Sequence, residues 1–238
     1  SIQESFLYTN NLGASSDLNI TIVDDSPTAQ SSNTDVAQSE MQSYNLMLML
    51  DISTSMTNAG IDGVVYSPDG SSATRLEIAK QSLIALGQEY FQQSTDVEIK
   101  VGVFAGGSYI LNGGTAYTDF VSFQTAVNAI TDAAGDPNVS DGTNYESALD
   151  SMEANFDVDA TGANISYFLS DGEISRGSTN LAADTNWVSF ADTNNIESFA
   201  TGIGTGLTNF SDLNYIHNVD SNGDGTTDDA LLVPDLTQ

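Results

Sequence analysis

From Tyr44 to the end of the chain, hydrophobic and polar positions alternate between the two spacings that distinguish strands from helices. Residues 45–52 form an almost continuous apolar run, which is typical of a strand buried on both faces. The segments that indicate strands are residues 45–52, 97–104, 115–121 (an edge strand), 165–169, 196–203 and 231–233. The segments with apolar residues at helical spacing are residues 75–92, 123–134, 145–156 and 187–194. Strands that alternate with helices predict an α/β fold of the doubly wound, Rossmann-like type, with a mostly parallel sheet covered by helices on both faces.

The first part of the chain follows a different pattern. Residues 18–23 have the near-alternating polarity of a strand, and Pro27 ends it because proline cannot extend a ladder of hydrogen bonds. We therefore interpret residues 1–28 as a short β-rich appendage, residues 29–43 as a polar linker and residues 44–238 as the main domain. The appendage resembles the last strands of the Ig-like modules repeated in giant bacterial adhesins. Neighbouring adhesin modules in the same chain are therefore expected as partners.

Charge is the feature of composition that narrows the function most. The 238 residues include 33 acidic and 4 basic side chains, for a formal net charge of −29. A chain this acidic repels the phosphates of nucleic acids and of anionic membranes, so neither is expected as a partner. Cations relieve its self-repulsion, which favours a calcium-rich or salty medium outside the cell. A merely soluble acidic protein is the plainer interpretation of the same charge.

The lack of certain residue types and segments further limits the kinds of protein that fit this sequence. The chain has no cysteine, which excludes disulfides, zinc–thiolate sites and a cysteine nucleophile. No apolar run reaches the length of a membrane-spanning helix, so direct membrane insertion is not expected. The chain begins at Ser1 without a signal peptide, and we interpret it as a fragment of a longer protein. These features fit a large bacterial protein that is secreted or displayed on the cell surface.

Oxygen-bearing side chains gather where two buried strands are predicted to end. Asp51 lies at the carboxyl end of the first strand of the main domain, Ser53 and Ser55 come directly after it, and Asp171 lies at the end of a later strand. Thr143 comes between them in the chain, just before a predicted helix. The carboxyl ends of parallel strands meet at one edge of a sheet, where ligands bind in this class of fold. The sequence therefore predicts a site for a hard cation made wholly of oxygen atoms.

Hydroxyl ligands have a consequence for what such a site binds. Mg²⁺ prefers six oxygen ligands at about 2.0–2.1 Å and gives up water reluctantly, while hydroxyls bring no charge to it. If Asp51 and Asp171 act through water, the ion keeps part of its positive charge and attracts a carboxylate from outside. The site is then expected to dock an acidic group of a partner.

The motif Asp51-x-Ser53-x-Ser55, followed by Gly-Thr at Thr143 and Asp-Gly at Asp171, resembles the metal-ion-dependent adhesion site of the von Willebrand factor A family. The resemblance extends from about residue 44 to the end of the chain. It implies that the three hydroxyls bind the metal directly and that the two carboxylates act mainly through water. It also implies a six-stranded sheet with one antiparallel edge strand, and Mg²⁺ or Ca²⁺, with Mn²⁺ as an alternative, as the bound ion. The first motif alone would be weak, because a serine-rich helix cap has the same pattern.

Residues 57–73 depart from a minimal member of that family. They form a long insertion directly after the predicted site, on the rim that carries the metal. The insertion is expected to select a partner, to cover the metal or to be a passive surface loop. The acidic composition, the lack of cysteine and the Ig-like opening together resemble the A domains of large repeat-in-toxin (RTX) adhesins of Gram-negative bacteria.

A second acidic segment has part of the pattern of a calcium loop. Oxygen-bearing side chains stand at its alternating positions, and Gly225 stands where such loops need a sharp turn. Leu231 stands where the usual pattern has glutamate, so additional Ca²⁺ and a plain acidic turn are both open interpretations. The candidate ligands are Asp220, Asn222, Asp224, Thr226 and Asp228.

Three functions compete on this evidence. The favoured one is metal-dependent adhesion to an acidic protein or another acidic surface ligand. The alternative is a structural or spacer domain of an adhesin, in which metal and calcium serve stability only. An enzyme is disfavoured, because the sequence has no P-loop, catalytic triad or paired-acid site.

Overall fold

The structure is a computed structural model, which describes residues 2–9, 15–22, 42–57, 65–66, 72–204, 207 and 210–233. The chain divides into two compact units, residues 1–39 and 40–238. In the first unit, β1 (Ile2–Thr9) pairs antiparallel with β2 (Ser15–Ile22). The strand expected at residues 18–23 overlaps β2. The expected linker lies outside the described residues as far as residue 41.

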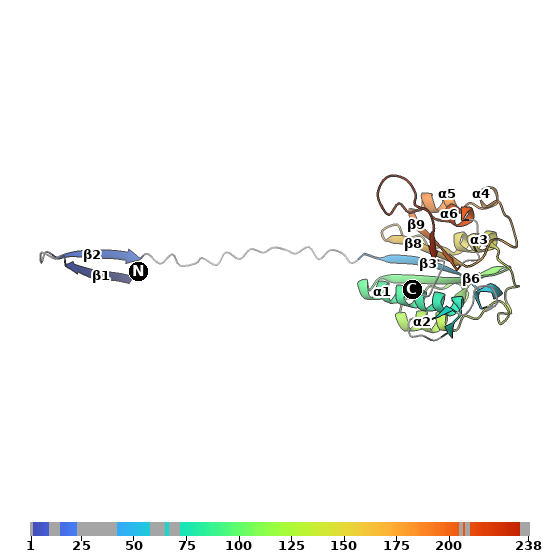
Figure 1. Ribbon diagram of the computed structural model, residues 1–238, viewed down its shortest axis with the longest axis horizontal. Coiled ribbons are helices and arrows are strands. Elements are labelled where there is room, and N and C mark those ends of the chain that lie inside the picture. Colours follow the sequence, from blue (N-terminus) through green and yellow to red (C-terminus); the bar gives the residue numbers. More distant parts are fainter. Residues whose placement is uncertain are drawn as a thin grey trace. The chain divides into compact units, whose positions relative to one another are not determined.

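The second unit is organised around a six-stranded sheet with the strand order β10-β9-β8-β3-β6-β7 (Figure 1). Its strands are β3 (Tyr44–Asp51), β6 (Val97–Phe104), β7 (Ser108–Ile110), β8 (Ala163–Ser170), β9 (Ile196–Ile203) and β10 (Leu231–Val233). Every neighbouring pair is parallel except β6 and β7, which are antiparallel. This confirms the predicted α/β fold with a mostly parallel sheet and one antiparallel edge strand.

β3 lies between β6 and β8 in the middle of the sheet, which explains its continuous apolar sequence. Leu46, Leu48 and Leu50 pack into the core on one face of the sheet. Met47 and Met49 pack into the core on the other face, and all five side chains are at most 1% exposed. Burying each side chain of this size contributes roughly 1.5–3 kcal/mol. The strand therefore holds the residue at its carboxyl end in a fixed place.

Helices cover both faces of the sheet, as the sequence predicts (Figure 1). One face carries α1 (Arg75–Gln93) and α2 (Phe120–Asn128). The other face carries α3 (Tyr145–Asn155), α4 (Leu181–Asp184), α5 (Trp187–Thr193) and α6 (Ser211–Ile216). Two short 3-10 turns are η1 (Thr54–Met56) and η2 (Leu111–Gly114). No helix within the described ranges is long and apolar enough to cross a membrane.

The edge of the sheet differs from the sequence prediction. The edge strand predicted at residues 115–121 is wrong, because β7 occupies the edge and pairs with β6. Of the predicted segment, Tyr117 forms an isolated antiparallel bridge to Ile99. The turn η2 interrupts the extended backbone between the two segments, since Asn112 and Gly113 both have positive φ, 54° and 60°.

The boundaries of α2 are also shifted from the predicted residues 123–134. Asp119 starts this helix early, because its carboxylate accepts a hydrogen bond from the Ser122 N–H at 2.9 Å and caps the first turn. The helix ends at Asn128. α4 and α6 were not predicted, because four and six residues are too few to show a helical period.

The described residues of the insertion at residues 57–73 include a short pair of strands. β4 (Val65–Tyr66) pairs antiparallel with β5 (Ser72–Ala73), directly before α1. Residues 58–64 and 67–71 of the insertion lie outside the described residues.

Candidate metal site

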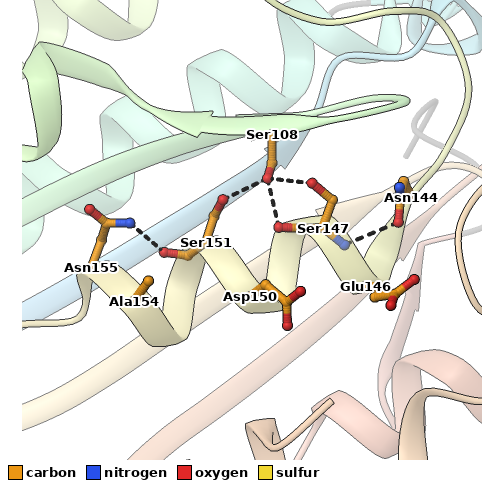
Figure 2. A pocket seen from close by; sticks show the side chains of 8 residues that line it. All are labelled: Ser108, Asn144, Glu146, Ser147, Asp150, Ser151, Ala154 and Asn155. Atoms are coloured by element: carbon orange, nitrogen blue, oxygen red, sulfur yellow. Dashed lines mark hydrogen bonds between the residues drawn. The ribbon is translucent and has the colours of Figure 1, made fainter. Parts of the chain in front are cut away.

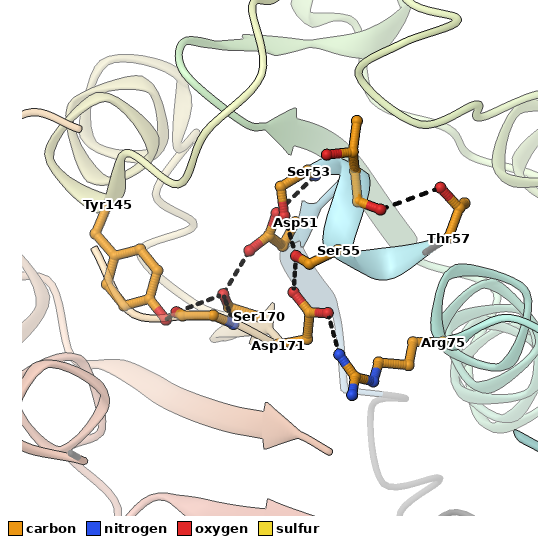
Figure 3. A network of polar contacts seen from close by, with 10 residues as sticks. Asp51, Ser53, Ser55, Thr57, Arg75, Tyr145, Ser170 and Asp171 are labelled. Carbon is orange, nitrogen blue, oxygen red and sulfur yellow. Dashed lines mark hydrogen bonds and ion pairs between the residues drawn. The ribbon is translucent and has the colours of Figure 1, made fainter. Parts of the chain in front are cut away.

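The predicted metal ligands come from three loops at the carboxyl edge of the sheet. Asp51 is the last residue of β3, Ser53 and Ser55 lie in the turn that follows, and Asp171 comes directly after β8. Thr143 lies two residues before α3. Figure 3 shows the first four of these side chains turned toward one another. The rule that parallel strands present their carboxyl ends at one edge accounts for this convergence.

Hydrogen bonds join the two carboxylates through Ser53 and Ser55 (Figure 3). The Ser53 N–H donates to Asp51 Oδ1 at 2.8 Å. The hydroxyls of Ser53 and Ser55 lie 2.9 Å apart, and Ser55 Oγ donates to Asp171 Oδ1 at 2.7 Å. On its other side, Asp51 Oδ2 accepts a hydrogen bond of 2.5 Å from Ser170 Oγ. A continuous chain of hydrogen bonds therefore runs from Asp51, at the end of β3, through Ser53 and Ser55 to Asp171, directly after β8.

Thr143 is held in place by its backbone. Its N–H donates to Ser175 Oγ at 2.9 Å, and its carbonyl accepts from the N–H groups of Ser175 and Arg176 at 3.0 and 3.1 Å. A Cβ added at Gly172 would lie 3.3 Å from Thr143 Oγ1. The threonine hydroxyl therefore lies beside the residue that follows Asp171, and glycine leaves room for it.

Burial makes this arrangement electrostatically costly without a cation. Asp51 is fully buried, and this burial, together with repulsion by Asp171, raises its pKa to about 7. Hydrogen bonds from Ser170 and Ser53 offset part of that rise. The other oxygen of Asp171 pairs with the buried guanidinium of Arg75, with 2.7 Å between Nη1 and Oδ2. A positive ion between the two carboxylates would remove the repulsion that remains.

The residues present fit a divalent cation of the hard type. An octahedral shell with bonds of about 2.0–2.1 Å places neighbouring oxygens about 2.9 Å apart, and the two serine hydroxyls are 2.9 Å apart. All the donors are oxygens, which suit Mg²⁺, Ca²⁺ or Mn²⁺. Within the described residues, no three His, Cys, Asp or Glu side chains are grouped so that they could hold a metal. The candidate ligands at this edge of the sheet are therefore two carboxylates, Asp51 and Asp171, and the hydroxyls of Ser53, Ser55 and Thr143.

The second predicted site, the loop from Asp220 to Asp228, follows α6 and is largely exposed. Asp220 accepts hydrogen bonds from the N–H groups of Gly223 and Gly225, both at 2.7 Å. Asp228 accepts from the Ser221 N–H at 2.8 Å. Asn222 and Asp224 likewise accept from N–H groups two residues onward, those of Asp224 and Thr226. The carboxylates thus face the backbone of their own loop, and calcium binding there stays a prediction.

Sequence reasoning missed two residues of the site. Ser170 directly precedes Asp171, so its position at the end of a buried strand was a usable signal. Arg75 gave no such signal, because 96 residues separate it from its partner Asp171. Only the packing of the first helix against the sheet edge brings the two together.

A polar pocket of about 340 Å³ lies beside the site, between β7 and α3 (Figure 2). Ser108 Oγ donates to the Ser147 carbonyl at 2.6 Å and lies 2.8 and 2.6 Å from the hydroxyls of Ser147 and Ser151. Asn144 caps α3 by accepting from the Ser147 N–H at 3.0 Å. These bonds tie the helix to the edge strand and so help to fix the loop that carries Thr143.

Comparisons with known proteins agree with this geometry. A family model described as von Willebrand factor type A domain matches residues 46–173. No curated protein matches the chain. Several solved structures share the fold, with sequence identities below 20%.

The similar structures include proximal thread matrix protein 1 from the mussel byssus with a zinc-occupied MIDAS (metal-ion-dependent adhesion site) motif. It has a TM-score of 0.61 and 15% identity, and the match covers 82% of this chain and 42% of that one. A von Willebrand factor type A protein from Catenulispora acidiphila has a TM-score of 0.56 and 16% identity, with 74% and 36% covered. The conserved hypothetical protein BatB from Bacteroides thetaiotaomicron has a TM-score of 0.51 and 19% identity, with 82% and 80% covered. The chain therefore spans about two fifths of the first two proteins.

Proposed function

Because this chain belongs to the von Willebrand factor type A domain family, we propose that it is a metal-dependent binding module of a large extracellular bacterial adhesin. A divalent cation at the carboxyl edge of the sheet docks an acidic group of a partner. Domains of this family are typically non-catalytic binding modules, and we assign this chain no reaction.

One observation carries the proposal: two buried carboxylates, Asp51 and Asp171, are linked by hydrogen bonds through two neutral serines, Ser53 and Ser55, at an edge of the sheet. Ser53, Ser55 and Thr143 would hold the ion, which supplies positive charge for a partner's carboxylate. The zinc-occupied MIDAS motif of the mussel protein supports a cation at this edge of the fold. The all-oxygen donor set favours Mg²⁺, Ca²⁺ or Mn²⁺ over zinc, which commonly takes nitrogen and sulfur ligands.

Composition supports the proposed setting. A net charge of −29 and the lack of cysteine suit a secreted or surface-displayed bacterial protein in a medium rich in cations. The Ig-like pattern of the first residues supports neighbouring modules in the same chain, as in RTX adhesins. Such an arrangement presents many copies of a weakly binding domain, and multivalency then supplies the strength of adhesion.

A structural or spacer domain is the second candidate function, and one observation favours it. Arg75 already compensates the charge of Asp171 inside the protein. The metal would then serve the fold alone, and adhesion would not depend on it.

Adhesion of beads coated with the domain separates the two functions. Binding to candidate cells or matrix proteins is expected to vanish with EDTA, to return with Mg²⁺ or Mn²⁺, and to be lost in Thr143→Ala. The matched control is Thr125→Ala on α2, whose exposed hydroxyl donates to the Val121 carbonyl of its own helix at 2.7 Å. Adhesion that persists in Thr143→Ala after the metal is lost would establish the structural function instead.

A further inference from the structure

The four basic side chains of the chain differ in the ion pairs and hydrogen bonds that they form within the protein. Lys80 Nζ donates to the carbonyls of Asn128 and Ile130 at 2.8 and 2.7 Å. Lys100 Nζ lies 2.5 Å from Asp157 Oδ2, and Arg75 pairs with Asp171. In the part of the chain that the structure describes, Arg176 is the one basic side chain with neither an ion pair nor a hydrogen bond. This is unexpected in a chain with 33 acidic residues.

The position of Arg176 places it on the rim of the candidate metal site. Its backbone N–H donates a hydrogen bond to the Thr143 carbonyl at 3.1 Å. A Cβ added at Gly142 would lie 2.5 Å from Arg176 Nε and 2.6 Å from Cδ, and one at Gly106 would lie 2.9 Å from Cδ. The side chain therefore rests on two glycines, one from the loop after β6 and one next to Thr143. Any larger residue at either position would displace it.

Asp141, an acidic residue on the same rim, already accepts hydrogen bonds from Thr54. Asp141 accepts hydrogen bonds from the Thr54 N–H and hydroxyl at 3.0 and 2.9 Å. These bonds are the main cause of its lowered pKa, to which Arg176 adds a smaller part. Arg176 itself is exposed. Its guanidinium is therefore available to an anion from outside.

We infer that Arg176 binds a second carboxylate of the partner, next to the carboxylate that the metal binds. The inference rests on the proposed function and adds the class of ligand: an acidic segment with two neighbouring carboxylates. A guanidinium fork pairs with a carboxylate through two parallel hydrogen bonds. It also offsets, at short range, the repulsion that the charge of −29 exerts on acidic partners.

Two capped peptides immobilised on beads serve as probes, one with a single aspartate among glycines and one with two adjacent aspartates. In Mg²⁺, the wild-type domain is expected to prefer the second peptide by about tenfold, equivalent to about 1.4 kcal/mol. Arg176→Gln should abolish that preference and leave the affinity for Mg²⁺, measured by calorimetry, unchanged. Lys80→Gln is the matched control, because it changes the net charge equally on a different part of the molecule.

The outcomes separate the inference from the proposed function. Magnesium-dependent binding of both peptides without a preference, or a preference that survives in Arg176→Gln, would overturn the role of Arg176 alone. A preference lost equally in Lys80→Gln would assign it to net charge and overturn the inference as well. Binding that is absent, or the same in EDTA, would contradict the proposed function and the inference with it.

Discussion

Arg75 and Asp171 form a buried ion pair, with side chains 6% and 0% exposed and 2.7 Å between Nη1 and Oδ2. Arg75 is the first residue of α1, and Asp171 follows β8. The guanidinium also lies against Gly204 at the end of β9, where an added Cβ would be 2.7 Å from Nε. The pair therefore joins the first helix to the edge of the sheet where the candidate metal ligands meet. It gives the protein a positive charge beside Asp171 that does not depend on a metal.

Removing this arginine is expected to destabilise the metal-free protein strongly. Arg75→Met leaves Asp171 as a buried charge without a partner, which costs roughly 3–5 kcal/mol. Urea unfolding in EDTA measures this loss. Mg²⁺ should restore more stability to the variant than to the wild type, because the ion supplies the missing positive charge.

The double variant Arg75→Met/Asp171→Asn is the control, since it removes both charges. In EDTA it should recover a large part of the lost stability. If the single and double variants are equally unstable, packing of the arginine matters and the ion pair does not.

Ser170 is expected to tune metal binding without touching the metal. Its hydroxyl donates to Asp51 Oδ2 at 2.5 Å and lowers the pKa of that carboxyl. In Ser170→Ala the pKa of Asp51 rises further, so protons compete better with the metal for this carboxylate. The affinity for the metal should fall by about 10–100-fold, as is typical when a group that orients a metal ligand is removed. Calorimetry with Mg²⁺ at neutral pH checks the effect. Ser166→Ala is the matched control, because Ser166 lies on the same strand but bonds to Ser198 at 3.0 Å; equal losses in both variants would count against the prediction.

His217 is expected to make the fold sensitive to acid. Its Nδ1 accepts the Ala200 N–H at 3.2 Å, and its Nε2 has no hydrogen-bond partner among the described residues. Burial lowers its pKa below the usual 6.5, although the negative charges of Asp228 and Asp229 oppose the shift. The folded state therefore binds fewer protons than the unfolded state, and stability falls as the pH drops through about 6.5.

Urea unfolding between pH 7.5 and 5.5 measures this contribution as a difference between wild type and His217→Asn, whose amide oxygen can still accept from Ala200. The comparison is needed because Asp51 acts in the opposite sense: its raised pKa adds stability as the pH falls below about 7. The wild type should lose more stability on acidification than the variant. Parallel pH profiles would show that His217 does not titrate in this range.

The acidic loop gives a separate prediction about calcium. If Asp220, Asp224 and Asp228 bind Ca²⁺, chelation should expose residues 220–228 to protease, and Asp224→Asn should be cleaved even with calcium present. Asp192→Asn, an exposed change on α5, is the control for charge. Equal cleavage with and without calcium would identify the segment as a plain acidic turn.

The central strands could be predicted because a strand buried on both faces has a continuous run of apolar residues. The run from Leu46 to Leu50 is apolar at every position because both faces of β3 are covered. The edge strand could not be placed, since Tyr117 and its neighbours have strand-like residues but only an isolated bridge to Ile99. Propensity does not show how far a segment is paired.

The candidate metal ligands could be grouped because each follows a predicted strand or precedes a predicted helix, and the fold class places those ends together. Arg75 could not be added, because its contact with Asp171 depends on where α1 begins against the sheet. Arg176 stood close to Asp171 in sequence, but only the structure shows that two glycines support it beside Thr143.

Anomalous diffraction from crystals soaked in Mn²⁺ tests the metal site most directly. We predict one peak at the carboxyl edge of the sheet, within about 2.0–2.6 Å of the hydroxyl oxygens of Ser53, Ser55 and Thr143. Asp51 and Asp171 should reach the ion mainly through water, with one position left for a water or an acidic ligand. Mn²⁺ bound elsewhere on the domain, with no peak between these three hydroxyls, would contradict the metal site and the adhesion proposed from it.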